Sequence, residues 1–491
     1  MIRIGIHIGS AVKALLIALV TTVLFAPMIA LTPAPILAAT ALYMGGTGHP
    51  LSYPEDTPEY TTGYVNWAYN DFVGPSGLCS GGDPGCAQLA VRTPAQFWPI
   101  TGLTDMSFDE SVALGLLNLD NCLRGVACTV TEPPFVATES RTLTDTSYTV
   151  FSYSQSGAIA SMQKSDLIAH PPVGTVSFVF VSNPNRPNGG ILERFVGVRI
   201  PILGVTFNGA TVTNSPQPTP LTTVDVVHQY DPVADFPTNP LNLLALLNTI
   251  MGFLYEHPEE GSGTPVLQGQ YQDSTYYLIP TTTLPMVRPL TLLPVLGPLL
   301  AEVLDPPLRV LVETGYDRTV NPGAPTPAKY LYFPNPITTA VNVLAAIPTG
   351  WDNGIAYLSG DPTNRPFHTA IPGPYGVGGP PVDAGAIDPY GPPVPYAALQ
   401  PTAMSARADV ADVGAEDVGS DGVAGEDVAD HSDAGPRRTN QRHRVVGVQP
   451  VAGGVAEHPL QVVGERPGRV AADVHPVRDR FVDHREMPND V

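Results

Sequence analysis

Ser154, Asp231 and His257 are the residues of this 491-residue chain best suited to act together as a chemical unit. A serine hydroxyl becomes a strong nucleophile when a histidine accepts its proton and a carboxylate orients that histidine. The sequence therefore predicts that Ser154 attacks an ester carbonyl, that His257 takes its proton, and that Asp231 orients the imidazolium. Such a reaction needs neither a metal ion nor an organic cofactor.

Ser154 lies in the segment Tyr148–Met162, whose sequence YTVFSYSQSGAIASM predicts a strand, a tight turn and a helix. An apolar, β-branched run precedes the turn, and small, helix-compatible residues follow it. A nucleophile elbow has this layout, because strain in its turn lifts the serine hydroxyl clear of the sheet. The usual motif is G-x-S-x-G, and here Ser152 and Ser156 stand at the two glycine positions. An S-x-S-x-S pattern also occurs by chance in serine-rich loops, so the prediction depends on the flanking strand and helix.

Two carboxylates compete for the role of the acid. Val224–Tyr230 is predicted to be a strand, Asp231 follows it directly, and Asp235 comes four residues later. In an α/β-hydrolase the acid follows the serine and precedes the histidine along the chain. Both residues satisfy that order, but only Asp231 comes directly after the strand. We therefore favour Asp231 and keep Asp235 as the alternative.

The base is chosen by its order in the chain and by the scarcity of other histidines. His257 lies just past Asn242–Tyr255, which is predicted to be an amphipathic helix. His170 and His228 precede the acid, and His368, which follows it, lies in a loop rich in proline and glycine. His257 is therefore the predicted base.

A glycine-rich turn, Gly45–Gly48, follows the first predicted strand of the domain, Thr40–Tyr43. In an α/β-hydrolase such a turn can supply backbone N–H groups to an oxyanion hole, because glycine lets the backbone approach a substrate oxygen. No G-K-[ST] follows, so a phosphate-binding loop is disfavoured. We predict an oxyanion hole formed by the N–H groups of Gln155, Gly46 and Thr47, and a plain strand–turn is the alternative.

The elements that must position these residues alternate between strands and helices. A continuous apolar run, Val176–Val181, follows the elbow helix and has the length of a strand that is covered on both faces. Alternation of this kind implies a mostly parallel sheet with helical crossovers. The predicted fold class is therefore α/β, in a domain that covers residues 40–399.

The two ends of the chain differ from this domain. Residues 1–39 combine Arg3 and Lys13 with an apolar run, Ala14–Leu31, which predicts a cleaved secretory signal or an uncleaved membrane anchor. Residues 400–491 are poor in aromatic side chains and carry many acidic ones, so we predict a disordered tail. The protein is expected to be exported, and either secreted or held at the cell membrane or envelope.

Four cysteines fall into two close pairs, Cys79 with Cys86 and Cys122 with Cys128. In an exported chain this spacing predicts two local disulfides, although four cysteines allow three connectivities. The pairs lack the CxxC spacing and the interleaved histidines of a zinc site. Local disulfides are therefore the favoured interpretation.

The charge balance argues against nucleic acid as a partner. The formal net charge is -21 and the chain has only three lysines. Binding of phosphate backbones needs concentrated lysine and arginine, and no basic stripe appears in the sequence.

The stretch Leu284–Val303 is apolar and is interrupted by prolines. Its place after the predicted base allows it to be a lid or a wall for an acyl chain. A buried helix pair broken by proline is the equal alternative.

Several motifs follow one another along the chain: the glycine-rich turn, the SYSQS elbow, the segments NPNRPNGG and YDPVADFP, the helix end before His257, and the segment DSTYYLIP. Over about residues 40–345 the chain resembles the PE-PPE domain of mycobacteria. It departs from the family at Ser152, where the family usually has glycine, and a signal or anchor stands where relatives have a PE or PPE module.

The resemblance implies a serine α/β-hydrolase related to cutinases, with esterase activity on acyl esters. Some anchored relatives without PE or PPE modules are acyltransferases that build envelope glycolipids, so acyl transfer is an alternative function. A non-catalytic surface protein that keeps the hydrolase shell as a scaffold is a further alternative. The expected partners are an acyl ester or glycolipid substrate and a membrane or cell-envelope surface.

Overall fold

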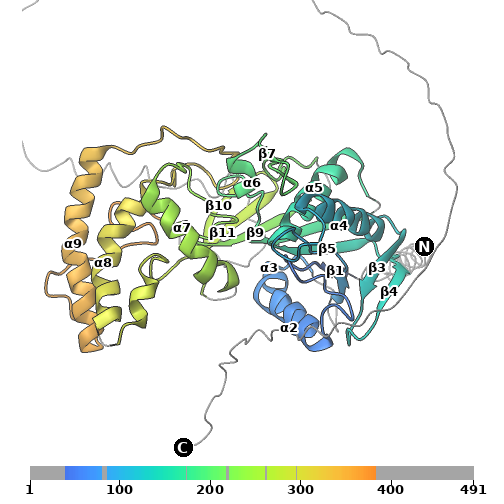
Figure 1. Ribbon diagram of the computed structural model, residues 1–491, viewed down its shortest axis with the longest axis horizontal. Helices are drawn as coiled ribbons and strands as arrows, with labels where there is room; N and C mark the ends of the chain where they lie inside the picture. The colour runs from blue at the N-terminus through green and yellow to red at the C-terminus, as the bar shows by residue number, and fades with distance from the viewer. Residues whose placement is uncertain are drawn as a thin grey trace, which may run out of the picture. The chain divides into compact units, whose positions relative to one another are not determined.

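The computed structural model describes residues 39–79, 86–172, 174–216, 221–259, 263–294 and 296–382 (Figure 1). The predicted tail, residues 400–491, lies outside these ranges, and so does the predicted targeting segment up to residue 38. Ala39, the last residue of that predicted segment, is buried in the first strand of the domain.

The domain is built around a nine-stranded sheet in which most neighbouring strands run parallel. The antiparallel pairings are those of β10 with β11, β2 with β3, and β3 with β4, all towards the edges of the sheet. This arrangement confirms the predicted α/β class. Across the sheet the strands are β10 Val266–Tyr271, β11 Ser274–Ile279, β9 Thr223–His228, β6 Thr175–Val181, β5 Ser147–Tyr153, β1 Ala39–Tyr43, β2 Ala87–Val91, β3 Ala127–Thr131 and β4 Thr138–Thr142, and a separate hairpin pairs β7 Arg199–Ile200 with β8 Val205–Thr206.

Side chains of the central strands alternate between two hydrophobic cores, one on each face of the sheet. In β6, Phe178 and Phe180 belong to one core, whereas Val179 and Val181 belong to the other. Successive residues of a strand face opposite sides, so a strand that is apolar at every position is buried on both faces. The apolar run Val176–Val181 is thereby confirmed as a central strand.

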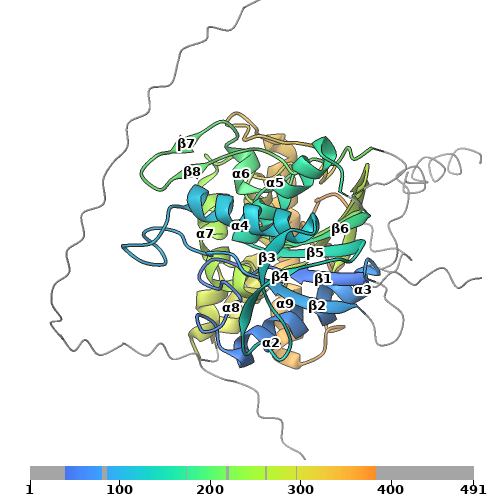
Figure 2. The ribbon, with the colours of Figure 1, turned by 90° about the vertical axis from the view of Figure 1, so that its right-hand side faces the viewer.

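Helices cover both faces of the sheet. α4 and α5 lie over one face, and α2 lies over the other (Figure 2). In the described ranges, no helix combines the length and the apolar character needed to cross a bilayer. The helices are α2 Pro58–Ala68, η1 Tyr69–Val73, α3 Gly74–Ser76, α4 Phe108–Leu123, α5 Gln155–Ala169, α6 Ile191–Arg194, α7 Leu243–Tyr255, η2 His257–Glu259, η3 Arg288–Leu292, α8 Leu296–Glu313 and α9 Pro336–Ser359.

The carboxyl ends of the central strands lie at the same edge of the sheet. Tyr153, which ends β5, pairs with Val181, which ends β6, and Val181 pairs with Val226 in β9. Residues that follow these strands therefore meet at this edge, which is where ligands bind in open α/β sheets. Ser154 comes directly after β5, and Asp231 comes three residues after β9.

The helix predicted before His257 is present as α7. Asn242 caps it, because its side chain accepts a hydrogen bond from the Ala245 N–H at 3.0 Å. An amphipathic helix usually buries its large apolar side chains. The faces of α7 are reversed: Asn248 and Gly252 are buried, and its large apolar side chains are mostly exposed.

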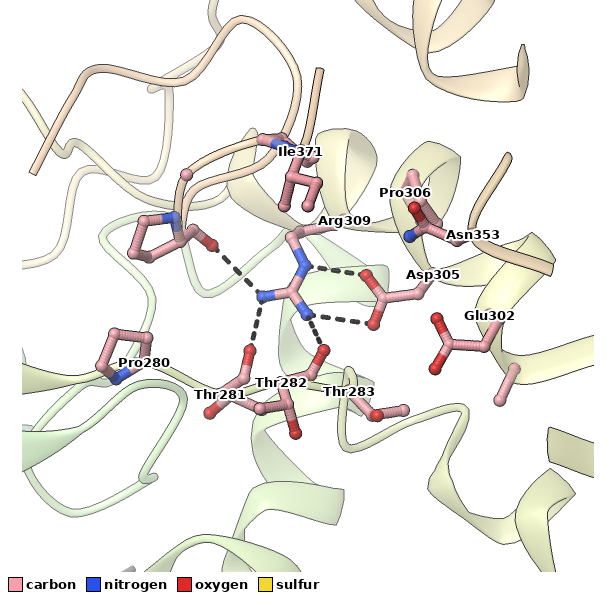
Figure 3. Close-up of a pocket in the computed structure, with 14 residues that line it drawn as sticks. Pro280, Thr281, Thr282, Thr283, Glu302, Asp305, Pro306, Arg309, Asn353 and Ile371 are labelled. Carbon is pink, nitrogen blue, oxygen red and sulfur yellow. Dashed lines mark hydrogen bonds and ion pairs between the residues drawn. The ribbon is translucent and has the colours of Figure 1, made fainter. Parts of the chain in front are cut away.

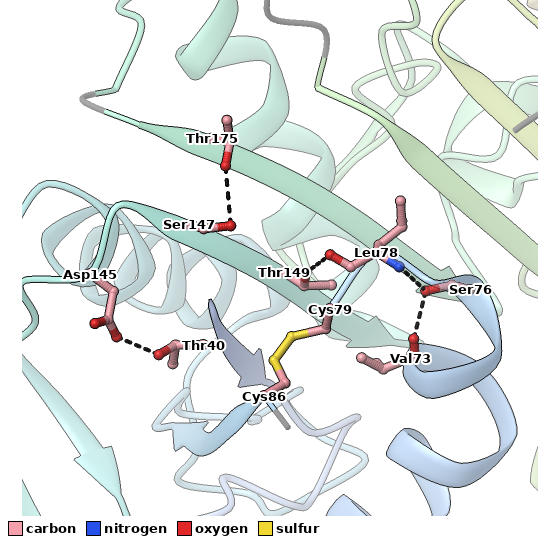
Figure 4. The surroundings of a disulfide bond; sticks show 10 residues. All are labelled: Thr40, Val73, Ser76, Leu78, Cys79, Cys86, Asp145, Ser147, Thr149 and Thr175. Carbon is pink, nitrogen blue, oxygen red and sulfur yellow. Dashed lines mark hydrogen bonds between the residues drawn. A yellow bond between two sulfur atoms is a disulfide. The ribbon is translucent and has the colours of Figure 1, made fainter. Parts of the chain in front are cut away.

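Both predicted disulfides are present. Cys79–Cys86 joins the segment after α3 to the residue before β2 (Figure 4), and Cys122–Cys128 joins the end of α4 to β3. Beside the first, Thr149 of β5 donates a hydrogen bond to the Leu78 carbonyl at 2.9 Å, so the sheet also holds this segment. Disulfides persist mainly in oxidising compartments. Export from the cytoplasm stays a prediction.

Candidate active site

Ser154 occupies a strained turn between β5 and α5. Its backbone angles are φ 56° and ψ -120°, which non-glycine residues adopt rarely and often at functional sites. The Ser154 N–H donates to the Val181 carbonyl at 3.2 Å, and the Ser156 hydroxyl accepts from the Tyr153 N–H at 2.9 Å. Serine at the second glycine position of the motif therefore helps to hold the turn.

The imidazole of His257 lies next to this serine, with Nε2 3.0 Å from Ser154 Oγ. Its ring stacks against Tyr153 and Phe253, with centroid distances of 5.3 and 5.7 Å. The carbonyl of His257 also accepts a hydrogen bond from the Tyr153 hydroxyl at 2.6 Å. These contacts hold the ring so that Nε2 is directed at the serine.

Asp231 lies at the other nitrogen of the imidazole, with Oδ1 2.9 Å from His257 Nδ1. The carboxyl is fully buried and accepts a hydrogen bond from the Val233 N–H at 3.0 Å. Burial alone would raise its pKa, but the charge of His257 and the hydrogen bonds from His257, Ser182 and Val233 hold the pKa below its ordinary value. Asp231 is therefore ionised at neutral pH, as an orienting acid must be.

Asp235, the alternative acid, is engaged elsewhere. Its carboxylate accepts hydrogen bonds from Arg318 at 2.6 and 3.0 Å and from the Tyr230 N–H at 2.8 Å. The buried Arg318 also donates to Glu313 at 2.9 Å. Asp235 thus belongs to a buried ion-pair network, and the geometry favours Asp231 as the acid.

Ser182 is a member of this cluster that the sequence analysis missed. Its hydroxyl donates to Asp231 Oδ2, and its Oγ lies 3.0 Å from His257 Nδ1. Ser182 directly follows β6, and its backbone is left-handed, with φ 51°. A signal was available in the sequence, because Ser182 ends the apolar run Val176–Val181 and the ends of neighbouring parallel strands lie together.

Ser182→Ala should lower kcat by about tenfold or more, because a hydrogen bond to a charged group contributes about 1.5–3 kcal/mol. Loss of this bond should also raise the pKa of Asp231, since the Ser182 hydroxyl is among the groups that lower it. The carboxylate then takes a proton at higher pH, so the loss of activity in acid moves to higher pH. Steady-state kinetics over the neutral and acid range measures both effects.

Ser152 offers the matched control. It is also a buried serine, and its hydroxyl has no hydrogen-bond partner among the described residues. Ser152→Ala should leave both kcat and the pH profile as they are. Equal effects of the two substitutions would show that Ser182 contributes only packing.

The predicted oxyanion donors surround Ser154. Gln155 is the first residue of α5, so its N–H has no acceptor within the helix. Gly46 lies close to the elbow, since a Cβ at this position would come within 3.1 Å of Tyr153 and 3.5 Å of Ser154. Gly46, Thr47 and Gln155 line the same cavity as Ser154. Their role as donors stays a prediction.

Ser154 and His257 open into a cavity of about 800 Å³. Its walls are mainly apolar and come from α2, the beginning of α4 with the segment before it, the hairpin β7–β8 and the end of α7. Such a lining suits an acyl chain better than a charged substrate. Prominent wall residues are Phe97, Ile100, Phe108, Ile200, Leu203 and Phe253.

The stretch Leu284–Val303 does not supply this wall, because none of its described residues lines the cavity. It forms η3 and the beginning of α8 instead. Leu284 and Val287 are buried in a small core beside α7 and α8, whereas Leu292 is exposed. The lid or acyl-wall interpretation is therefore wrong for this cavity, and the buried alternative fits the first part of the stretch.

A second hollow, of about 270 Å³, lies beside α8 and α9 (Figure 3). Arg309 lies in it and donates hydrogen bonds to the carbonyls of Thr281, Thr282 and Pro374 and to both carboxylate oxygens of Asp305. These bonds use all five N–H donors of a guanidinium group. Arg309 thus fastens the segment after β11 to α8, and its donors are already satisfied by the protein.

The other histidines that were considered as the base do not line the cavity beside Ser154 and His257. His170 pairs with Asp166 at 2.9 Å, and His228 pairs with Glu256 at 2.7 Å. Within the described ranges, no group of three or more His, Cys, Asp or Glu side chains is arranged to hold a metal ion.

Comparison with known proteins gives relatives in Mycobacterium tuberculosis. PPE family protein PPE42, of strain CDC 1551 / Oshkosh, is 36% identical over 68% of this chain and 53% of its own length. Esterase PE16, of strain ATCC 25618 / H37Rv, is 35% identical over 63% of this chain and 54% of its own length. SL1278 acyltransferase Chp1, of the latter strain, is 29% identical over 66% of this chain and 74% of its own length.

This chain spans about half the length of PPE42 and of PE16. No solved structure matches it. Residues 84–317 match the PE-PPE domain, and this range includes Ser154, Asp231 and His257. The resemblance inferred from the motifs is thereby confirmed, and the chain carries a PE-PPE domain.

Proposed function

We propose that the PE-PPE domain is a serine acyl hydrolase that cleaves acyl esters through a covalent acyl-enzyme. The observation that carries this proposal is the hydrogen-bonded chain from Ser154 through His257 to the buried Asp231, with distances of 3.0 and 2.9 Å. The name of the relative Esterase PE16 supports the reaction class. The apolar cavity beside the serine supports an acyl ester as the substrate.

In the proposed reaction, His257 Nε2 takes the proton of Ser154 while Oγ bonds to the ester carbonyl carbon. The carbonyl electron pair moves to oxygen, and the N–H groups of Gln155, Gly46 and Thr47 stabilise the oxyanion. Collapse of this intermediate breaks the bond to the alcohol, which leaves with the proton from His257. Water then attacks the acyl-enzyme by the same steps, which releases the acid and restores the serine. Asp231 stays ionised throughout.

Acyl transfer to an alcohol acceptor is the second candidate. The relative named SL1278 acyltransferase Chp1, of which this chain covers 74%, favours it. Both reactions share the acyl-enzyme, and only the second nucleophile differs. A long-chain acyl ester supplied with increasing amounts of a sugar acceptor separates them. Free acid that does not depend on the acceptor indicates hydrolysis, whereas acylated sugar indicates transfer.

A fluorophosphonate probe applied to the full chain tests the proposal. We expect phosphonylation of Ser154, because the probe reacts with a serine that a neighbouring base activates. Mass spectrometry of the peptides locates the adduct, and Ser154→Ala protein is the control that must stay unlabelled. A folded protein that gives no adduct and does not turn over short or medium acyl esters would be a scaffold with a hydrolase shell.

A further inference from the structure

The exposed face of α7 is apolar. Gly252 is pressed against the backbone of Tyr230, where an added Cβ would lie 2.2 Å from the carbonyl oxygen, and the other buried residues of α7 are Ala245, Asn248 and Thr249. Most of the large apolar side chains of α7 are on the outside, the reverse of the usual helix of a globular protein. Their exposed fractions are 77% for Leu243, 47% for Leu247, 57% for Ile250, 56% for Phe253 and 62% for Leu254.

This face is continuous with the candidate active site. Phe253 is more than half exposed, yet it stacks against His257 and lines the cavity. Two other segments that contribute residues to the cavity carry exposed apolar side chains as well: Ile100 at 70% and Leu103 at 82% before α4, and Ile202 at 74% between β7 and β8. The segment before α4 and the β7–β8 hairpin project on the side of the sheet where α7 lies (Figure 2). We call these three residues and the five of α7 the apolar rim.

The apolar rim is almost free of charge on a strongly acidic chain. α7 has no charged residue, Asp105 is the only one in Phe97–Ser107, and Arg199 is the only one in Val196–Phe207. The chain as a whole has a net charge of -21. Contact of such a surface with an uncharged apolar phase is favourable in free energy, because it removes apolar side chains from water. The surface also lacks the lysine and arginine clusters that attract anionic lipids.

We propose that the apolar rim docks on the surface of an uncharged lipid layer. The acyl chain of a lipid in that layer then passes from the layer into the cavity without crossing water, because the rim and the cavity share Ile100 and Phe253. The inference that docking delivers substrate depends on the proposed function as an acyl hydrolase. Docking itself does not require catalysis. Burial of the exposed apolar side chains in the lipid surface supplies the binding free energy.

Single cysteines that carry a polarity-sensitive dye test this docking in the full chain. All four native cysteines are paired, so an introduced cysteine is the one free thiol. Leu247→Cys, Ile250→Cys and Leu103→Cys place the dye on the rim. Val126→Cys is the control: Val126 is 51% exposed and follows the far end of α4, a 16-residue helix about 24 Å long whose first residue, Phe108, lines the cavity.

Vesicles of dioleoylphosphatidylcholine that contain a nitroxide lipid should quench the three rim dyes and shift their emission to shorter wavelength. The dye at Val126 should not respond. The readout is local, so binding of the membrane by other parts of the chain does not imitate it. Replacing part of the lipid by anionic phosphatidylglycerol should weaken the quenching at low salt, because the acidic chain is repelled.

Three outcomes would overturn the proposal. No quenching at the rim, or equal quenching at Val126, would show that the rim does not dock on lipid. Stronger quenching by the anionic vesicles would show an electrostatic mode of binding. A dye response that depends on protein concentration without vesicles would show that a second copy of the chain covers the rim. Fluorophosphonate labelling of the same proteins reports separately on the proposed catalytic function.

Discussion

Replacement of Ser154 by alanine should lower kcat for acyl esters by about 10⁶-fold. Without the hydroxyl no acyl-enzyme forms, and His257 has no proton to accept. Release of a coloured alcohol from a short-chain ester measures the loss, at equal concentrations of folded protein. Because the nucleophile and the base act as a unit, the double variant Ser154→Ala/His257→Ala should be no slower than either single variant.

Ser152→Ala is again the matched control for this loss. The two serines are two residues apart, but the hydroxyl of Ser152 is buried without a hydrogen-bond partner among the described residues. Its removal should be nearly neutral for activity and stability. A Ser154→Ala protein that keeps more than about one hundredth of the parent kcat would contradict the assignment of the nucleophile.

Asp231→Asn should lower kcat by about 10⁴-fold in protein that stays folded. The amide keeps the shape of the side chain but not the charge that stabilises the imidazolium of His257, whose Nδ1 is 2.9 Å from Oδ1.

Asp231→Asn should also change the pH dependence of the free energy of unfolding. The pKa of Asp231 is held below its ordinary value, so its ionised form stabilises the fold at neutral pH. This contribution is lost as the pH falls through the folded-state pKa, so urea unfolding should show the parent and the variant converging in acid.

Asp235→Asn separates the two carboxylates. The substitution removes one of the two carboxylate partners of the buried Arg318 and weakens the hydrogen bond from the Tyr230 N–H. Breaking a buried ion pair by removing one partner costs about 3–5 kcal/mol, and the remaining pairing with Glu313 places the expected loss near the lower limit. We therefore expect a loss of stability with a much smaller fall in kcat than for Asp231→Asn. The reverse ranking of kcat in folded proteins would show that Asp235 is the acid.

Local patterns in the sequence were enough to predict the central elements. The apolar runs that became β5, β6 and β9, and the helices α5 and α7, have strong periodicity or clear turn residues around them. The close spacing of the cysteines was likewise enough to predict the disulfides, because short loops bring paired residues together. These features depend on neighbours in the chain, so they could be predicted without knowledge of the fold.

The choice between Asp231 and Asp235 could not be made firmly from the sequence. Both carboxylates follow the same strand, and they differ in partners that come from distant parts of the chain, His257 for one and Arg318 for the other. Ser182 was missed for the same reason, since its partners lie 49 and 75 residues away in the chain. Only the alignment of β5, β6 and β9 in one sheet brings these groups together.

The burial of apolar segments was also decided by the tertiary structure. From the sequence, Leu284–Val303 could be either a lid or acyl-chain wall or a buried helix pair, and none of its described residues lines the cavity. The helix α7 is predicted to be amphipathic, but its large apolar side chains are mostly exposed, and Phe253 among them lines the cavity. Sequence by itself determined which segments are helices and strands and supplied the residue types of the site, because these depend on local backbone preferences and on chemistry. Which apolar face is covered, and which carboxylate meets the histidine, depends on packing between distant segments, and only the tertiary structure decided it.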